Sequence, residues 1–140
     1  MEEEKDRFSQ MCAMHSHKRV LLLMSPATYR AGAFLQAAER LHLETIVGLD
    51  LPPTLADYWH VPLGLDFQNL QQSLATIVTY AQEHPLTAIL SVDDSASELA
   101  AYACVALGLP SNSPQASEAA RDKLLMRQLM STGGAPCPIF

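Results

Sequence analysis

Three carboxylates lie within six residues at the end of an apolar run. Asp93 and Asp94 follow residues 87–92 directly, and Glu98 comes four residues later. Carboxylates gathered at a strand end can bind a cationic amine or a metal ion. The helix dipole also favours acids in a first helical turn, and Ser95-x-x-Glu98 has the form of a capping box. A ligand site and a stabilised helix start are therefore both open interpretations.

A second polar pair follows the first apolar run. Tyr29 and Arg30 lie in the segment 25–32, where a phenol and a guanidinium near a helix N-terminus can meet an anionic ligand. This segment has one glycine, Gly32, where a dinucleotide-binding G-x-G-x-x-G loop needs three, and the sequence has no P-loop. We therefore expect neither NAD binding nor Walker-type nucleotide binding. The alternative is a solvated arginine beside a tyrosine that covers the sheet edge.

Two positive charges near the end of the chain lie where a helix does not favour them. Lys123 falls in the first turn of a helix that Asp122 can cap, where the helix dipole disfavours a cation. Arg127, four residues further on, repels Lys123. A bound anion would remove this conflict, which makes Lys123 a candidate anion-binding residue. Asp122 offsets part of the charge and a lysine side chain can extend into solvent, so a purely structural interpretation also stands.

The cysteine and histidine residues give little indication of chemistry. Cys12, Cys104 and Cys137 are an odd number without C-x-x-C spacing, which argues against a disulfide framework or a zinc site and fits a reducing cytosol. Cys104 lies among apolar residues at helical spacing, so we expect it in the core rather than as a nucleophile. His15 and His17 lack a third ligand, and we expect them to be solvated.

Composition limits the class of protein. A chain of 140 residues with 49% apolar and 17% charged residues predicts one compact domain without a membrane span. Nine basic against fifteen acidic residues give a net charge of −6 without a basic stripe, so no nucleic-acid partner is expected. The acidic N-terminus has no apolar core typical of a secretory signal, and we predict a cytoplasmic protein.

Short apolar runs alternate with segments of helical period, which is typical of parallel strands joined by crossover helices. The expected strands cover residues 20–24, 45–49, 61–67 and 87–92, although 54–67 as a whole is ambiguous. The expected helices cover residues 31–41 and 70–81, 95–107 with Gly108 closing it, a short helix from Pro114, and Asp122 to about Thr132. We therefore predict an α/β fold: a three-layer, open, mostly parallel, Rossmann-like sheet flanked by helices.

The expected organisation has three parts. Residues 1–18 are polar and aperiodic and predict a disordered tail, 19–113 form the α/β domain, and 114–140 form a helical linker. The apolar ending Ile139-Phe140 follows directly after a helix and its closing glycines. We therefore expect a fragment that stops at the start of a further domain.

The end of the chain carries a family resemblance. Four segments of this sequence resemble the stretch that leads into the catalytic region of ATP-grasp ligases. They are Gly-Leu-Pro at 108–110, Asn-Ser-Pro at 112–114, Ala-Arg-Asp-Lys-Leu-Leu-Met-Arg at 120–127 and Gly-Gly-Ala-Pro-Cys-Pro at 133–138. Residues 28–31 and 92–94 resemble the same family's N-terminal domain, which is similar to that of biotin carboxylase. The resemblance covers about residues 18–140.

The resemblance implies an enzyme that uses ATP and Mg²⁺ to phosphorylate a carboxylate, which an amine or a thiol then attacks. Lys123 matches a lysine that reaches the nucleotide phosphates in several such enzymes. Tyr29, Arg30, Asp93 and Asp94 match positions on the substrate side, where Glu98 is a further candidate. The family's glycine-rich loop and acidic magnesium ligands are missing from this sequence. The resemblance therefore implies one wall of an active site for small-molecule carboxylate and amine substrates, and a chain that is inactive alone.

Two other functions remain as alternatives. The first is a free-standing, non-catalytic binding or dimerisation domain with the same fold, acting as a homodimer. The second is a receiver-type signalling domain, which requires an acid pair after the first strand. Ser25-Pro26 follow Met24 at that place, which argues against the second alternative.

Overall fold

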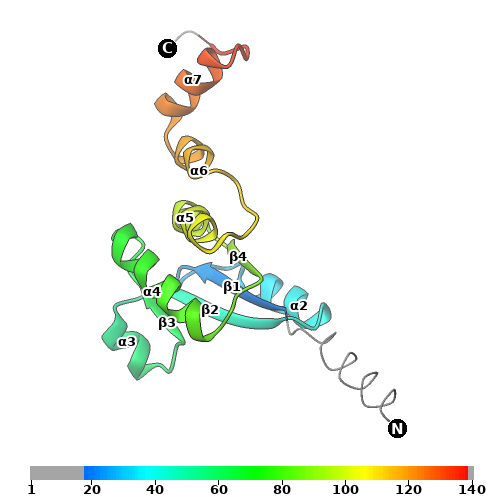
Figure 1. The fold of residues 1–140 in the computed structure, drawn as a ribbon, viewed down its shortest axis with the longest axis vertical. Coiled ribbons are helices and arrows are strands. Elements are labelled where there is room, and N and C mark those ends of the chain that lie inside the picture. Colours follow the sequence, from blue (N-terminus) through cyan, green and yellow to red (C-terminus); the bar gives the residue numbers. More distant parts are fainter. Residues whose placement is uncertain (1–17, 139–140) are drawn as a thin grey trace, which may run out of the picture.

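The computed structural model describes residues 18–138, which form one parallel sheet, helices on both of its faces and a helical arm (Figure 1). The predicted α/β class is confirmed. The elements are, in chain order, β1 (Arg19–Met24), α2 (Ala31–Arg40), β2 (Glu44–Asp50), α3 (Pro53–Tyr58), β3 (Leu63–Leu65), α4 (Leu70–Glu83), β4 (Ala88–Ser91), the 3₁₀ helix η1 (Asp94–Ala96), α5 (Ser97–Leu107), α6 (Pro114–Arg121) and α7 (Lys123–Thr132).

The apolar strand β1 lies at the centre of the sheet. The strand order is β3-β2-β1-β4, and every pair is parallel. Leu21 of β1 lies opposite Ile46 of β2 and Ile89 of β4. Residues 20–24 are all buried. A strand buried on both faces is apolar throughout, which is why the run in β1 does not alternate with polar residues.

Successive residues of β1 contact different layers of helices, because side chains alternate across a strand. Leu21 and Leu23 belong to a core cluster with residues of α4 and α5. Leu22 and Met24 belong to a second cluster, against which Phe34 of α2 packs. The three predicted layers are therefore α4 and α5, the sheet, and α2.

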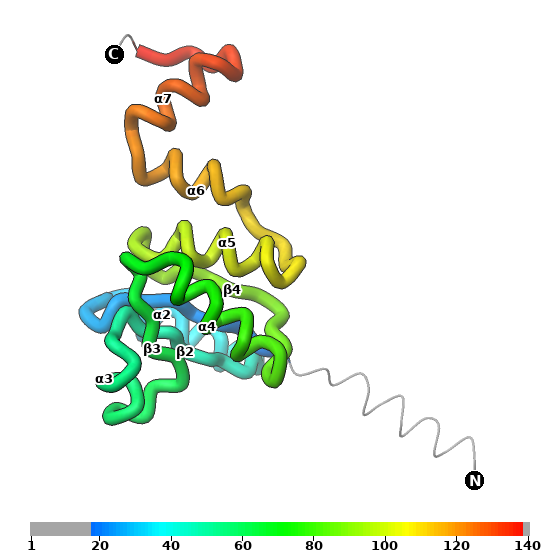
Figure 2. The backbone as a smooth tube through the Cα atoms, turned by 60° about the vertical axis from the view of Figure 1, so that its left-hand side comes forward, coloured from blue at the N-terminus to red at the C-terminus, as the bar shows by residue number. Residues whose placement is uncertain are grey.

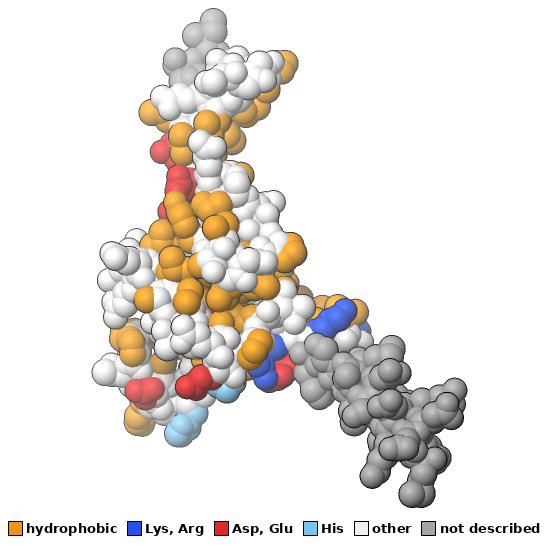
Figure 3. Space-filling view, viewed as in Figure 1, with side chains coloured by type: hydrophobic (Ala, Val, Ile, Leu, Met, Phe, Trp, Pro, Cys, Tyr) orange, Lys and Arg blue, Asp and Glu red, His pale blue; other side chains and the backbone are white. Residues whose placement is uncertain are grey.

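β4 forms one edge of the sheet in the described part of the chain. Leu90 on this strand is 46% exposed, and Val105 of the neighbouring helix α5 is also exposed. Figure 3 shows apolar side chains over the middle of this side of the molecule, around β4 and α5. The edge therefore presents apolar surface to solvent.

Helices α6 and α7 form an arm that leaves the sheet beyond α5 (Figure 2). Ser113 caps α6 by accepting a hydrogen bond from the backbone N–H of Ala116, and Pro114 occupies the first helical position. The Tyr102 hydroxyl of α5 donates to Glu118 Oε1 of α6 at 2.6 Å. None of the residues in α7 is buried. The arm is therefore held to the body through α6.

The helix α3 was not predicted. Pro52 and Pro53 follow β2, where the sequence predicts only the end of that strand. Proline is also favoured at the first position of a helix, where its missing N–H costs no hydrogen bond. Pro53 begins α3 in this way. No helix in residues 18–138 is long and apolar enough to span a bilayer.

The contact between α3 and β3 provides a test of the fold. A Cβ atom added at Gly64 would lie 2.4 Å from the Cβ of Ala56 and 3.0 Å from the carbonyl oxygen of Leu51. We predict that Gly64→Ala lowers the free energy of unfolding by about 1–3 kcal/mol, because α3 and β3 must separate. Urea unfolding followed by circular dichroism measures the change.

Gly32→Ala in α2 is the matched control, because a Cβ atom at Gly32 has no neighbour within 4 Å. This variant should be more stable by about 0.5–1 kcal/mol, since alanine favours the helix. A Gly64→Ala protein as stable as the wild type would contradict the close packing of α3 on β3.

Candidate functional site

The loops after β1 and β4 lie next to each other at one end of the sheet, because these parallel strands are neighbours. The chain continues from β1 to α2 on one face and from β4 to α5 on the other. Open α/β sheets bind ligands where successive connections diverge in this way. We call residues 25–30 and 92–96 the switch-point loops.

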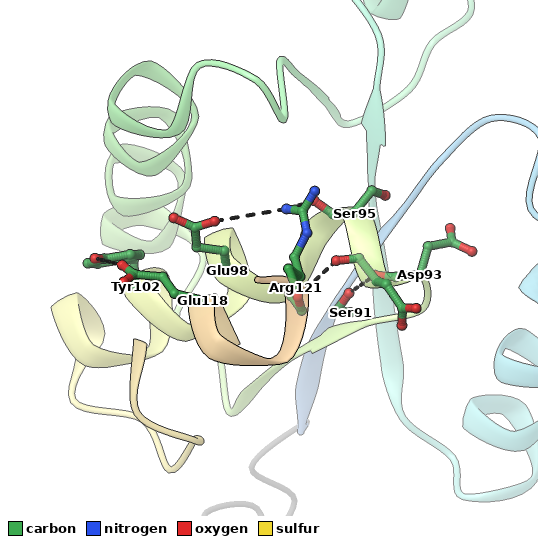
Figure 4. Close-up of polar contacts among 9 residues, drawn as sticks. Ser91, Asp93, Ser95, Glu98, Tyr102, Glu118 and Arg121 are labelled. Carbon is green, nitrogen blue, oxygen red and sulfur yellow. Dashed lines mark hydrogen bonds and ion pairs between the residues drawn. The ribbon is translucent and has the colours of Figure 1, made fainter. Parts of the chain in front are cut away.

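Asp93 connects the two switch-point loops. Its Oδ2 accepts a hydrogen bond from the backbone N–H of Ser25 at 2.9 Å, and its Oδ1 accepts one from the Thr28 hydroxyl at 2.6 Å. The Ser91 hydroxyl donates to the backbone carbonyl of Asp93 (Figure 4). Both carboxylate oxygens have partners within the protein, so the geometry favours a positioning role for Asp93 over direct ligand contact.

Opposing effects act on the pKa of Asp93. Burial raises the pKa of this carboxyl, but the hydrogen bonds from Thr28 and Ser25 and the charge of Arg30 lower it. The net result is a pKa below the ordinary value of 3.8. The carboxylate is therefore ionised at neutral pH, and its hydrogen bonds to the β1 loop are charge-assisted.

Tyr29 and Arg30 project from the same loop into solvent. Tyr29 is 88% exposed, so the expectation that it covers the sheet edge is wrong, whereas Arg30 is exposed, as a solvated arginine would be. Arg30 Nε donates to the Tyr29 hydroxyl at 3.2 Å, and the guanidinium carbon lies 5.5 Å from the centre of the ring. The hydrogen bond to Tyr29 is the main cause that raises the pKa of Arg30. The pair therefore offers a permanent cation and an aromatic surface at the switch point.

The three acids predicted as one cluster have separate environments. Asp93 holds the β1 loop, and Asp94 is exposed in η1. Glu98 lies in the first turn of α5, and its Oε2 is 3.9 Å from Nη1 of Arg121 in α6 (Figure 4). The acids therefore do not form a single ligand site.

The predicted capping box of Ser95 and Glu98 is wrong. The 3₁₀ helix η1 delays the start of α5 to Ser97, and Ala96 precedes it without a side-chain cap. Ser97 donates its hydroxyl to the carbonyl of Asp94 instead. The Ser95 hydroxyl oxygen is buried without a hydrogen-bond partner. The N-cap is therefore Ala96, one residue after Ser95, and neither Ser95 nor Glu98 is at its capping-box position.

Lys123 occupies the first position of α7, as predicted, and its side chain is exposed. Asp122 Oδ1 accepts hydrogen bonds from the backbone N–H groups of Leu124 and Leu125, which confirms the predicted cap. α7 lies at the far end of the arm, away from α2 and the loop before it (Figure 1). The structure therefore does not bring Lys123 together with Tyr29 and Arg30.

Two cavities open at the carboxyl ends of the strands. One of about 360 Å³ lies where β2 and β3 end and is lined by Asp50 and Asp66 among others. The other, of about 510 Å³, lies between the body and the arm and is lined by Glu98 and Arg121 among others. Arg121 was not predicted from the sequence, because its partner Glu98 lies on another helix and no local spacing connects the two.

The last candidate residue, Cys104, lies in the core. Cys104 is 1% exposed, and burial raises the pKa of its thiol, so the predicted core position is confirmed. Within residues 18–138, no group of three or more His, Cys, Asp or Glu side chains is placed to hold a metal ion. The predictions for residues 1–17 and for Ile139-Phe140 lie outside the described residues.

Comparison with known proteins identifies a similar fold. No family model and no curated protein matches the sequence. Among solved structures, the chain is similar to an L-amino acid ligase from Bacillus licheniformis, with a TM-score of 0.68 and 20% sequence identity over 87% of this chain. The chain spans 32% of the length of that ligase chain. The two proteins therefore share the fold of this α/β region.

The link made by Asp93 predicts a pH-dependent loss of stability. Asp93→Asn should lower the free energy of unfolding by about 1–2 kcal/mol at pH 7, after allowance for partial solvent exposure. Because the pKa in the folded state lies below 3.8, the carboxylate contributes its full stabilisation above that value. The contribution is lost as the pH falls through the folded-state pKa. Urea unfolding between about pH 7 and pH 2 measures the difference.

The neighbouring variant Asp94→Asn is the control, since Asp94 is exposed in η1. We expect it to change stability by less than about 0.5 kcal/mol. Equal losses in the two variants at pH 7 would contradict the link between the loops, as would an Asp93→Asn deficit that does not shrink at acid pH.

Proposed function

We propose that this chain is the N-terminal α/β domain of an ATP-grasp ligase that joins a carboxylate to an amine or a thiol. The likeness in fold to the L-amino acid ligase, over 87% of this chain, carries the proposal. The motifs in residues 108–138, which resemble the approach to the catalytic region of ATP-grasp ligases, support it independently of the fold. In this proposal, residues 19–113 form the domain and 114–140 lead into the next one.

The switch-point loops form the substrate-facing wall in this proposal. Arg30 is an exposed guanidinium at the ligand-binding end of the sheet, and a guanidinium can bind a carboxylate through two parallel hydrogen bonds. Tyr29 fixes the direction of Arg30 through its hydroxyl and its ring. Asp93 is a positioning residue, since it holds the loop that carries both. Asp94 remains a weaker candidate on the same edge.

The reaction divides amide formation into two displacements. A substrate carboxylate oxygen attacks the γ-phosphorus of ATP, and ADP leaves, which gives an acyl phosphate. The amine nitrogen then attacks the acyl carbon, inorganic phosphate leaves with the electron pair of the broken C–O bond, and the nitrogen releases one proton to the solvent. Magnesium neutralises the phosphate charge in such transfers. Lys123 is exposed at the start of α7 and would contact the nucleotide phosphates, whereas the metal ligands would come from outside residues 18–138.

The first test uses the protein encoded by the complete native reading frame. With ATP and Mg²⁺, it should release phosphate only when both a carboxylate and an amine or thiol are present, and mass spectrometry should detect the joined product. The 140-residue chain alone should release none. ATP hydrolysis by the 140-residue chain that survives Lys123→Ala would contradict the proposal, as would a reading frame that stops at Phe140.

Two variants of the native protein separate the proposed contacts. Arg30→Gln should raise KM for the carboxylate about tenfold, because a charge-assisted contact is lost, and leave KM for ATP unchanged. Lys123→Ala should raise KM for ATP instead. Arg40→Gln, an exposed arginine at the end of α2, is the control and should change neither constant. Identical effects of Arg30→Gln and Arg40→Gln would remove Arg30 from the substrate wall.

A non-catalytic dimerisation domain is the second candidate function. Two exposed apolar residues favour it, Leu90 on the edge strand β4 and Val105 on the neighbouring helix α5. Light scattering of the 140-residue chain distinguishes it from the first candidate: a stable dimer that Leu90→Ser dissociates would support dimerisation through this edge, and a monomer would exclude it.

A further inference from the structure

The short helix α3 keeps its large apolar side chains on the outside. Its small residue Ala56 is 2% exposed and packs against β3, where Gly64 allows the close approach. Leu55, Tyr58 and Trp59 are 46%, 75% and 67% exposed. A helix on a folded body normally buries its apolar stripe, so this arrangement is unusual. The residues that we call the α3 surface are Leu55, Asp57, Tyr58 and Trp59.

Two neighbouring aromatic rings are the most exposed part of the α3 surface. The rings of Tyr58 and Trp59 meet edge to face, with their centroids 5.6 Å apart and their planes at 85°. An aromatic ring attracts a cation to its face, and tryptophan does so best. Tyrosine and tryptophan are also among the residues most enriched at binding hot spots. The pair therefore suits a ligand that brings both positive charge and apolar surface.

The stretch of chain that includes α3 has acidic residues but no lysine or arginine. Residues 41–120 contain nine aspartates and glutamates, and neither basic residue occurs among them. Asp57 is exposed in α3 itself, and its carboxylate has no hydrogen bond or ion pair within residues 18–138. Figure 3 shows acidic side chains and a histidine beside apolar ones at the lower left, over α3. Such a surface repels phosphate groups and attracts a basic partner.

A cavity at the other end of α3 adds two further carboxylates. Its volume is about 360 Å³, and Pro53 at the start of α3 lines it together with Asp50 and Asp66. Asp50 Oδ1 accepts the backbone N–H of Phe67 at 3.1 Å, and Asp66 Oδ1 accepts that of Gln68 at 2.9 Å. Each carboxylate keeps its second oxygen without a hydrogen bond inside residues 18–138. The cavity therefore suits a side chain with an apolar stem and a cationic tip, as in arginine or lysine.

The length of α3 sets the spacing between two bound cations. Pro53 and Trp59 are six residues apart, which is about 9 Å along a helix. A polyproline II segment returns to the same face every third residue, about 9 Å further on. Segments of this kind also dock on surfaces lined by aromatic residues. A segment with two basic residues three positions apart would thus place one in the cavity and the other on the Trp59 ring.

We propose that the α3 surface and the cavity beside it bind a basic, extended segment of a partner protein. One arginine or lysine enters the cavity lined by Asp50 and Asp66. A second, three residues away, stacks on Trp59 and pairs with Asp57. The inference does not rest on the proposed ligation, because this binding needs neither ATP nor turnover and uses no residue of the switch-point loops.

Trp59 is the single tryptophan of the chain, so intrinsic tryptophan fluorescence reports on this surface. The probe is the peptide acetyl-GRPPRPG-amide, titrated into the 140-residue chain. It should change the fluorescence of Trp59 and approach saturation by about 1 mM. The peptide acetyl-GRRPPPG-amide has the same composition with adjacent arginines and should bind about fivefold more weakly. Acetyl-GEPPEPG-amide, with glutamates in place of the arginines, should not bind.

Variants locate the contacts, with isothermal titration calorimetry as the readout and the circular dichroism spectrum unchanged. Asp57→Asn, Asp66→Asn and Trp59→Leu should each weaken binding of acetyl-GRPPRPG-amide about three- to fivefold. Glu83→Gln and Leu41→Ala are the matched controls, because both side chains are exposed and lie outside α3 and its cavity. These two variants should bind the peptide as the wild type does.

Three results would overturn the proposal. The first is no binding of acetyl-GRPPRPG-amide up to about 1 mM. The second is equal affinity for the two arginine peptides, or unchanged affinity in all three variants of the site. The third is a dimer of the free chain that Trp59→Leu dissociates, because the surface would then belong to a contact between two copies.

Discussion

The burial of β1 on both faces is the constraint on which the rest of the structure depends. Five consecutive apolar residues, 20–24, cannot leave one face in water, so the chain must place helices on both sides of this strand. It does so by sending α2 to one face and α4 and α5 to the other. The connections of β1 and β4 therefore diverge, and the divergence creates the switch point where Tyr29, Arg30 and Asp93 meet. The candidate site is in this sense a consequence of the core.

The ionised side chain of Asp93 gives the switch-point loops a defined arrangement. The β1 loop has no regular secondary structure of its own, and Asp93 connects it to the end of β4 through the backbone of Ser25 and the hydroxyl of Thr28. A charge-assisted contact of this kind is stronger than a neutral one, so the loop has a preferred position. Tyr29 and Arg30 can then remain exposed and still point in a fixed direction, which is what ligand recognition requires.

The sequence predicted the elements well because their signals are local. Apolar runs predicted the strands, Gly108 predicted the end of α5, and Asp122 predicted the start of α7. The apolar neighbours of Cys104 correctly predicted its position in the core. The predictions were weaker where one sequence signal has two meanings. Prolines that can end a strand also begin α3, and a carboxylate that can bind a ligand also binds a loop, as Asp93 does. Choosing between such meanings requires the three-dimensional partner, which spacing along one element does not contain.

The failed capping box at Ser95 illustrates how a long-range partner overrides a local rule. Had α5 started one residue earlier, at Ala96, Ser95 would have capped it and Glu98 would have bonded back to the backbone N–H of Ser95. Instead Glu98 turns toward Arg121, and the Ser95 hydroxyl is left buried and unbonded, at a cost of about 1–3 kcal/mol. The weak, exposed ion pair recovers at most about 1 kcal/mol of this. A local arrangement that loses stability without a compensating contact is expected at a functional site rather than in a scaffold, and here it occurs at the wall of the cavity that joins the arm to the body.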